Sequence, residues 1–236
     1  MQSLKAFVYV STAFSNSDIL EIYEKVYPID VDPNVIAVLF KGLSTSLLNT
    51  IAPMLIGKKI NFYTFSKHLA EVLVQDAQSH VPVCIVRPTI VGPAHREPFP
   101  GWVDNFNGYS GFISGSSKGV IRCVYCTSQG TIDVVPVDHV VNLTLVAAMN
   151  LGSGSRKMND LIVYNHSNTP NPYIYSKCQG SLISAFEDNP PNEMFWYPSM
   201  IFTKSHVVFA IASFFFHYIP ALLADGISII AGKTPR

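Results

Sequence analysis

The hydrophobic positions along the chain alternate between short continuous runs and longer runs at helical spacing. Residues 7–10 and 81–88 are apolar at nearly every position, which is typical of strands buried on both faces of a parallel sheet. Residues 63–78 between them follow a helical pattern instead. The side chains that this helix is expected to bury are Leu69, Val72, Leu73 and Ala77. Strands that alternate with helices predict an α/β fold with a parallel sheet.

Two further helices are predicted before residue 63. Residues 17–25 begin with a serine and carry several acidic residues, which indicates a short acidic helix. Asp32 followed by Pro33 is a stronger helix start, because aspartate caps the first turn and proline fits its first position. The helical run that follows, residues 34–48, is interrupted at Gly42. We expect this run to pack beside the strand and the helix described above.

The second half of the chain continues the alternation. Residues 120–126 and 161–166 indicate strands, and residues 131–149 indicate a strand that leads into a helix. Asp138 lies where that helix begins, and we expect it to cap the helix rather than to act as a base. A further helix is predicted to start at Asn171.

The composition changes from Pro190 onward, so we predict a boundary there between residues 1–189 and residues 190–236. Residues 205–224 carry no formal charge over twenty positions. That length can cross a bilayer, but polar rings and a proline within the stretch argue against a spanning helix. We therefore expect a helix hairpin that packs on the domain or lies in the membrane interface.

Composition excludes some classes of function. Hydrophobic residues make up 48% of the chain and charged residues 14%, and the formal net charge is zero. A neutral chain of this kind has no net positive charge to attract the phosphates of a nucleic acid. Four cysteines are too few for a disulfide framework in 236 residues, and Cys123 and Cys126 form a lone C-x-x-C without a second pair. We therefore predict neither a metal site nor a redox motif.

The candidate chemistry lies at the start of the helix at 63–78 and at the end of the first strand. Tyr63 and Lys67 are four residues apart, so a helix places both side chains on one face. An ammonium beside a phenol stabilises the phenolate, and such a tyrosine can protonate a carbonyl oxygen while hydride reaches the carbon. Ser11 and Thr12 follow the first strand, at the edge where parallel sheets bind ligands. Because neighbouring strand residues point to opposite sides, only one of these hydroxyls can serve.

This order of strand, hydroxyl residues, Tyr-Lys helix and a strand ending in Arg87-Pro88 resembles the second half of an extended short-chain dehydrogenase/reductase. More specific blocks resemble the alcohol-forming fatty acyl-CoA reductases of animals, and they are spread over nearly the whole chain. These blocks are residues 18–28, 55–57, 63–71, 86–91, 100–105, 136–138 and 232–236. The resemblance implies a Rossmann-like, doubly wound parallel sheet followed by a helical, apolar C-terminal segment.

The resemblance also implies roles for individual residues. Tyr63 would donate the proton to the developing alkoxide, and Lys67 would assist it and bind the nicotinamide ribose. Thr12, which the resemblance favours over Ser11, would donate a hydrogen bond to the substrate oxygen. The implied cofactor-binding set is Tyr63, Lys67, Pro88, Thr89, Ile90 and Val91, and the implied substrate-binding set is Thr12, Trp102 and Phe106.

Members of this family carry an earlier half with a glycine-rich turn that holds the pyrophosphate of the cofactor. No G-x-x-G-x-x-G run occurs in the sequence. The resemblance therefore implies that the N-terminal half of the dinucleotide-binding fold is missing, and we interpret the chain as a fragment of a longer reading frame. The alternative is a truncated, non-catalytic remnant that associates with a membrane.

The function that the resemblance implies is the NADPH-dependent reduction of long-chain fatty acyl-CoA to a fatty alcohol, a precursor of waxes and ether lipids. The implied partners are the acyl-CoA, NADPH and a membrane surface, with the protein facing the cytosol on the endoplasmic reticulum or the peroxisome. A sugar-nucleotide epimerase or a hydroxysteroid dehydrogenase would share Tyr63 and Lys67. Neither explains the loop at residues 102–105 or the apolar C-terminal segment.

Overall fold

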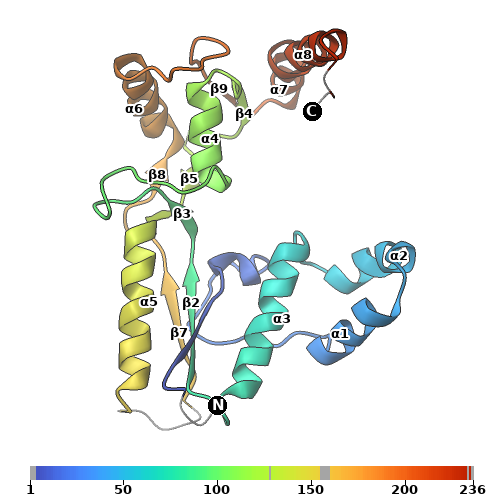
Figure 1. The fold of residues 1–236 in the computed structure, drawn as a ribbon, viewed down its shortest axis with the longest axis vertical. Helices are drawn as coiled ribbons and strands as arrows, with labels where there is room; N and C mark the ends of the chain where they lie inside the picture. The colour runs from blue at the N-terminus through green and yellow to red at the C-terminus, as the bar shows by residue number, and fades with distance from the viewer. Residues whose placement is uncertain (1–3, 128, 155–159, 233, 235–236) are drawn as a thin grey trace. The chain divides into compact units, whose positions relative to one another are not determined.

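The computed structural model describes residues 4–127, 129–154, 160–232 and 234, and the chain divides into two compact units (Figure 1). Unit 1 comprises Met1–Trp102 and Val135–Asn168, and unit 2 comprises Val103–Val134 and Thr169–Arg236. The boundary predicted at residue 189 lies inside unit 2, and the division of the chain into domains at that point stays a prediction.

Unit 1 is built on a parallel sheet, as the apolar runs predict. Its described strands are β1 (Phe7–Val10), β2 (Val83–Pro88) and β7 (Ile162–His166), in the order β1-β2-β7. Both pairs of neighbours are parallel, with Val8 beside Cys84 and Val86 beside Tyr164. All six residues of β2 are buried, because this strand has a neighbour on each side and a helix over each face.

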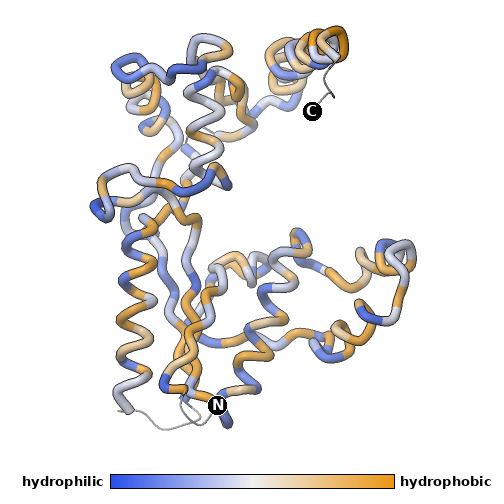
Figure 2. The backbone as a smooth tube through the Cα atoms, viewed as in Figure 1, coloured by the Kyte–Doolittle hydropathy of each residue, from blue (hydrophilic) through white to orange (hydrophobic). Residues whose placement is uncertain are grey.

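The two faces of β2 are covered by different helices, α3 (Phe62–Ala77) and α5 (Val137–Gly152) (Figures 1 and 2). Val83 and Ile85 pack with Val74 of α3, whereas the alternate residues Cys84 and Val86 pack with Ala147 of α5. This two-sided packing follows from the alternation of side chains along a strand. It confirms the predicted doubly wound α/β fold.

Helix α3 begins where the sequence predicts, but it buries a different stripe of residues. Asn61 caps the helix, since its side-chain oxygen accepts the backbone N–H of Thr64 at 2.9 Å. Leu69 and Val74 are buried, whereas the Leu73 side chain is 44% exposed, so the prediction that Leu73 is a core residue is wrong. The buried face of the helix also carries charged and polar residues, which shifts the apolar contacts away from Leu73.

The segment before α3 contains two helices, α1 (Pro33–Gly42) and α2 (Thr45–Ile56). Asp32 caps α1 and accepts the backbone N–H of Asn34 at 2.8 Å, as predicted, and the break at Gly42 is also confirmed. Residues 17–25 form turns and bends rather than the predicted short helix. Interactions with distant residues hold this segment in its irregular form.

Helix α5 starts beside a short pair of strands, β3 (Ile90–Gly92) and β6 (Val134–Pro136). Pro136 occupies the N-cap position, so the prediction that Asp138 caps this helix is wrong. Asp138 lies in the first turn, and its carboxylate instead accepts the backbone N–H groups of residues 95, 96 and 97 at 2.8, 2.9 and 3.3 Å. These bonds attach the loop after β3 to the start of α5.

Unit 2 contains short strand pairs and helices. Strand β4 (Cys123–Tyr125) is parallel to β9 (Ile201–Thr203), and β5 (Thr131–Ile132) is antiparallel to β8 (Tyr173–Ile174). The helices before the C-terminal segment are α4 (Gly108–Ser117) and α6 (Tyr175–Asp188). The helix predicted to start at Asn171 therefore starts later, because β8 occupies the residues directly before it.

The C-terminal segment is one continuous helix rather than the predicted hairpin. It comprises α7 (His206–Ser213), the π-helical turn η2 (Phe214–Tyr218) and α8 (Ile219–Ile230). Pro220 lies at the start of α8 directly after the wide π turn. A proline has no N–H to donate, and a wider turn accommodates its ring where a regular turn would clash. His206–Ile230 is long and apolar enough to cross a membrane by length and composition, with a mean hydropathy of 2.0.

Candidate active site

Tyr63 and Lys67 lie on the first turns of α3, next to the carboxyl end of β1. The Lys67 ammonium donates a hydrogen bond from Nζ to the carbonyl oxygen of Val10 at 3.0 Å. The same Nζ lies 5.9 Å from the ring centroid of Tyr63 and 5.2 Å from that of Tyr9. An ammonium has three N–H donors, and the bond to Val10 uses one of them. The predicted pair therefore shares one side of the helix and faces the end of the strand.

Tyr63 and Tyr9 both lie near Lys67, but their surroundings differ. The Tyr63 side chain is 54% exposed and is open to a ligand. Tyr9 lies on β1 and is partly buried against the core of unit 1. Burial, with smaller contributions from the charges of Glu71 and Tyr63, raises the pKa of Tyr9 to about 12. Tyr9 is therefore a weak acid, and Tyr63 is the better placed of the two to protonate a substrate.

Ser11 and Thr12 are both buried after β1, and their hydroxyls have different partners. Ser11 Oγ donates to Glu71 Oε1 at 2.5 Å. Thr12 Oγ1 accepts the backbone N–H of Phe14 at 3.2 Å and so caps the 3₁₀ turn η1 (Ala13–Asn16). The bond of Ser11 uses its hydroxyl hydrogen, whereas the bond of Thr12 leaves its hydroxyl hydrogen available to donate. This difference supports the choice of Thr12 over Ser11, which stays a prediction.

A buried ion pair lies directly behind these hydroxyls. Glu71 on α3 and Arg87 on β2 have fully buried side chains and form two charge-assisted hydrogen bonds. The Arg87 Nε–H donates to Oε1 at 2.8 Å and Nη2–H donates to Oε2 at 2.7 Å. A bidentate bond of this kind fixes both position and orientation. The pair therefore locks the helix that carries Tyr63 to the central strand.

Arg87 also fixes the segment at residues 17–25. Its Nη1–H donates to the carbonyl oxygen of Tyr23 at 3.1 Å, and Nη2–H donates to that of Lys25 at 2.8 Å. The Asn165 side-chain amide, at the end of β7, donates to the carbonyl oxygen of Ile22 at 2.8 Å. These bonds satisfy backbone carbonyls that a helix would otherwise use. They explain why the predicted short helix does not form.

The charged and polar groups of this cluster are the site features that the sequence interpretation missed. Charged and polar residues of a predicted helix are normally expected to be solvated, but His68 and Glu71 are both buried. His68 Nε2 lies 2.9 Å from the carbonyl oxygen of Tyr27, and burial lowers the pKa of the imidazole. One signal was present: an arginine inside a strand that is otherwise apolar requires a buried partner of opposite charge.

The remaining predicted ligand-binding residues are distributed over both units. Pro88 ends β2, and the backbone N–H of Thr89 donates to the carbonyl oxygen of His166 at 3.0 Å. Ile90 and Val91 form β3, so residues 88–91 follow directly from the carboxyl end of the central strand. Trp102 belongs to unit 1, where its carbonyl oxygen accepts the N–H of Ala94, whereas Phe106 belongs to unit 2 and is 70% exposed. Their roles as cofactor-binding and substrate-binding residues stay predictions.

The donor groups at the carboxyl end of β1 are of the kind that binds the ribose hydroxyls of a nicotinamide cofactor, and this role stays a prediction. Lys67 retains N–H donors beyond the one bound to Val10, and Tyr63 has an exposed phenol. In the described part of the chain, no group of three or more His, Cys, Asp or Glu side chains converges. Burial raises the pKa of the thiols of Cys123 and Cys126, which disfavours the thiolate that metal binding requires.

Comparison with known sequences identifies similar proteins over the whole chain. The sequence profile of an NAD-binding family described as male sterility protein matches residues 1–144. Fatty acyl-CoA reductase 1 of Xenopus laevis is 40% identical over 237 aligned residues, and fatty acyl-CoA reductase 1 of Homo sapiens is 38% identical. Each alignment covers 100% of this chain and 46% of the relative. The chain thus spans about half the length of the curated relatives it matches.

Comparison with solved structures supports the fold. The reductase domain of a nonribosomal peptide synthetase from Mycobacterium tuberculosis superposes with a TM-score of 0.51 at 17% identity, covering 87% of this chain and 43% of that one. UDP-glucuronic acid 4-epimerase from Bacillus cereus, solved with NAD, has a TM-score of 0.50 at 14% identity, covering 84% and 48%. At these identities the likeness concerns the fold alone. It confirms the predicted Rossmann-like architecture.

Proposed function

Because the chain belongs to the NAD-binding family described as male sterility protein, we propose that it carries the catalytic residues of an NADPH-dependent fatty acyl-CoA reductase. The observation that carries the proposal is the Tyr63–Lys67 pair, held at the carboxyl end of β1 by the bond from Lys67 to Val10. The family establishes a nicotinamide cofactor, and NADPH in particular is part of the proposal. The activity belongs to the longer protein, since the chain spans 46% of these relatives.

The substrate class follows from the relatives rather than from the fold. Similarity at 38–40% identity over the full chain to proteins named fatty acyl-CoA reductase favours a long-chain acyl-CoA. The epimerase shares the architecture at 14% identity, so its fold says nothing about a sugar-nucleotide substrate here. The epimerase and hydroxysteroid dehydrogenase alternatives are therefore not favoured.

The chemistry requires two reductions of the same carbon. Hydride addition to the thioester and loss of the thiol produce an aldehyde, and a second hydride addition produces the alcohol. When bound, the nicotinamide supplies the hydride. Tyr63 donates its phenolic proton to the oxygen that becomes negative, and the Lys67 ammonium stabilises the phenolate left behind. Thr12 donates its hydroxyl hydrogen to the same oxygen, which stabilises the charge as it develops.

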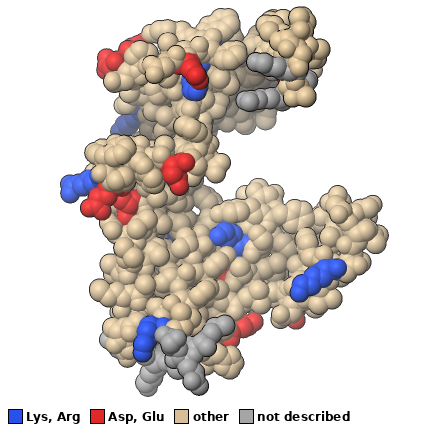
Figure 3. Space-filling model, in the orientation of Figure 1, with Lys and Arg blue, Asp and Glu red and all other residues tan. Residues whose placement is uncertain are grey.

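The proposed role of the membrane rests on the C-terminal helix. Many large apolar side chains of this helix are exposed, and they include Ile211, Leu223 and Ile227 at 56%, 64% and 68% exposure. Figure 3 shows that charged residues are sparse on the face of the molecule in view. We propose that this helix associates with the cytosolic surface of the endoplasmic reticulum or the peroxisome, where long-chain substrates and alcohols partition.

Substitution of Tyr63 by phenylalanine tests the catalytic assignment in the full-length protein that contains this chain. Tyr63→Phe removes the proton donor and nothing else, so alcohol formation from palmitoyl-CoA and NADPH is expected to disappear while expression and unfolding temperature stay unchanged. Tyr23→Phe is the matched control, because Tyr23 is 61% exposed and lies outside the Tyr63–Lys67 pair. Full activity in Tyr63→Phe would show that another group donates the proton.

A further inference from the structure

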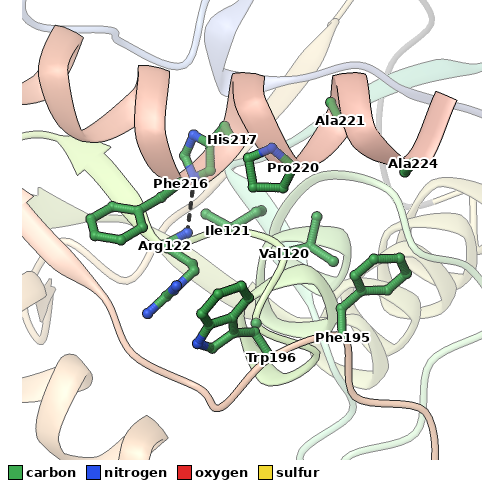
Figure 4. A pocket seen from close by; sticks show the side chains of 11 residues that line it. Val120, Ile121, Arg122, Phe195, Trp196, Phe216, His217, Pro220, Ala221 and Ala224 are labelled. Carbon is green, nitrogen blue, oxygen red and sulfur yellow. Dashed lines mark hydrogen bonds between the residues drawn. The ribbon is translucent and has the colours of Figure 1, made fainter. Parts of the chain in front are cut away.

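Unit 2 contains an apolar pocket beside the C-terminal helix, separate from the Tyr63 site in unit 1 (Figure 4). Its volume is about 480 Å³, which lies in the range of sites that hold small ligands. One wall is the helix from Phe216 to Ala224. The facing walls are the segment at residues 119–122, which precedes β4, and the loop that carries Phe195 and Trp196.

The lining of this pocket is polar at one end and apolar at the other. Figure 4 shows Val120 and Phe195 below Ala221 and Ala224 of the helix, with no charged side chain among them. At the other end, the Arg122 side chain extends between the rings of Trp196 and Phe216. A cavity with one charged end and one hydrocarbon end matches an amphiphilic ligand.

Arg122 is a cation without a carboxylate partner within ion-pair distance among the described residues. Its guanidinium carbon lies 4.8 Å from the Trp196 ring centroid and 4.6 Å from that of Phe216, and Nη2–H donates to Ser199 Oγ at 3.0 Å. Its Nε is buried and has no hydrogen-bond partner. Since half-buried cations are normally paired, a guanidinium without a carboxylate partner favours the anionic group of a ligand, which would bind the outer nitrogens rather than the enclosed Nε.

The position of Arg122 is fixed by the helix that forms the opposite wall. The backbone N–H of Arg122 donates to His217 Nε2 at 3.0 Å. Burial, and then the charge of Arg122, lower the pKa of His217, which favours the neutral imidazole that this bond requires. The bond holds the helix against residues 119–122, and the pocket is therefore formed before any ligand arrives.

We propose that this pocket binds a single-chain amphiphile with an anionic head, such as a long-chain fatty acid. The head group binds at Arg122, and the hydrocarbon chain lies against Val120, Phe195 and Ala224. Longer chains bind more tightly, because each additional methylene buries more apolar surface. The inference does not rest on the proposed reductase activity, since binding requires neither a nicotinamide cofactor nor the Tyr63 site.

The sequence supplies a spectroscopic reporter for this site. The chain contains two tryptophans, and Trp196 lines the pocket whereas Trp102 lies in unit 1. Trp102→Phe leaves Trp196 as the single tryptophan, and excitation at its long-wavelength edge selects its emission over that of the tyrosines. Titration with stearate that carries two bromine atoms at mid-chain is expected to quench this emission in a saturable way. Unbrominated stearate should restore the emission, whereas octanoate at the same concentration should not.

Two substitutions in the Trp102→Phe background separate the ends of the pocket. Arg122→Gln removes the charge, and we expect it to weaken stearate binding about tenfold, the effect of losing one charge-assisted bond, while binding of the uncharged stearyl alcohol is unchanged. Ala224→Phe fills the apolar end and should abolish saturable quenching. Ala210→Phe is the matched control, because Ala210 is exposed on α7 and does not line the pocket.

Each alternative outcome overturns the proposal. Quenching that rises without saturation, or that stearate does not reverse, would show adsorption of the lipid to the exposed helix. If Ala210→Phe and Ala224→Phe lose the saturable quenching equally, the pocket is not the binding site. If Ala224→Phe fails to fold, competition between brominated and unbrominated stearate in the Trp102→Phe protein still shows whether stearate occupies a saturable site beside Trp196. Equal weakening of stearate and stearyl alcohol by Arg122→Gln would contradict the head-group assignment.

Discussion

Glu71 and Arg87 join the parts of unit 1 that carry the candidate site. Glu71 accepts from Ser11 at the end of β1 and from Arg87 on β2, and Arg87 in turn binds the carbonyl oxygens of Tyr23 and Lys25. A fully buried charge that loses its partner has no water to compensate it. The orientation of the first turns of α3, with Tyr63 and Lys67, therefore depends on residues that do not touch the substrate.

Substitution of Glu71 by glutamine tests this dependence. Glu71→Gln leaves the Arg87 charge buried without a counter-charge, and we expect the free energy of unfolding to fall by about 3–5 kcal/mol. Equilibrium unfolding in urea measures the change. Glu193→Gln is the matched control, because Glu193 is exposed, lies 3.6 Å from Lys118 and should contribute less than about 1 kcal/mol. A loss in Glu71→Gln no larger than in the control would contradict the structural role.

The two hydroxyls after β1 offer a second test at the residue scale. Thr12→Val removes the proposed donor to the substrate oxygen and should lower kcat by about 10²–10³ in the full-length protein, whereas Thr12→Ser should retain most activity. Ser11→Ala breaks the bond to Glu71 and should lower the unfolding temperature with a much smaller change in kcat. Steady-state kinetics and thermal unfolding of the three variants separate these effects. The reverse pattern would assign the catalytic hydroxyl to Ser11.

Asp138 shows how one side chain joins two elements of unit 1. Its carboxylate accepts three backbone N–H groups from the loop after β3 while it lies in the first turn of α5. The bonds to the N–H groups of residues 95–97, with that of His95 first, hold the pKa of this carboxyl well below its ordinary value, against an opposing effect of desolvation. The interaction therefore connects two elements and also makes stability depend on pH.

The pH dependence has a definite sign. The folded state binds the Asp138 proton less readily than the unfolded state, so the stabilisation is complete above a pH of about 4 and is lost as the pH falls towards the folded pKa. Asp138→Asn should lower stability at pH 7 and flatten the decrease between pH 4 and pH 2.5, as measured by urea unfolding. Asp76→Asn, at an exposed position of α3, is the control. If the free energy of unfolding of Asp138→Asn falls between pH 4 and pH 2.5 as much as that of the unsubstituted protein, this account is contradicted.

The C-terminal helix shows where element prediction from sequence fails. Polar rings and a proline suggested a hairpin, but the π turn at Phe214–Tyr218 allows the helix to continue through Pro220. The polar rings that argued against a membrane helix bind other residues of unit 2 instead. His206 Nε2 lies 2.8 Å from Tyr125 Oη, and His217 Nε2 accepts the N–H of Arg122. The protein-facing side of the helix is thus defined by its histidines.

At the scale of the whole molecule, zero net charge and an exposed apolar helix predict the manner of membrane binding. The chain should float with vesicles of neutral phosphatidylcholine, and an increase in salt should not release it, because its attraction is hydrophobic rather than electrostatic. The double substitution Ile211→Asn with Leu223→Asn should weaken flotation. The matched control is Val35→Asn with Val38→Asn on α1, where both side chains are also exposed. Binding only to anionic vesicles would contradict this prediction, and so would an equal loss of flotation in the two double variants.

The sequence by itself determined the features that depend on neighbouring residues. The apolar runs indicated β1, β2 and β7, Asp32-Pro33 marked the start of α1, and the spacing of Tyr63 and Lys67 placed both side chains on one side of α3. These features follow from local backbone geometry and from the periods of strands and helices. A pattern of a few residues is enough to specify them.

Only the tertiary structure decided which polar groups are buried and which hydroxyl is occupied. The partners involved are far apart in the chain: Ser11 and Glu71 are separated by 60 residues, and Arg122 and His217 by 95. Whether Glu71 meets water or Arg87 depends on how the helix packs on the sheet, which no local pattern encodes. The free energy of a buried charge depends on its partner in space, and that partner exists only in the folded chain.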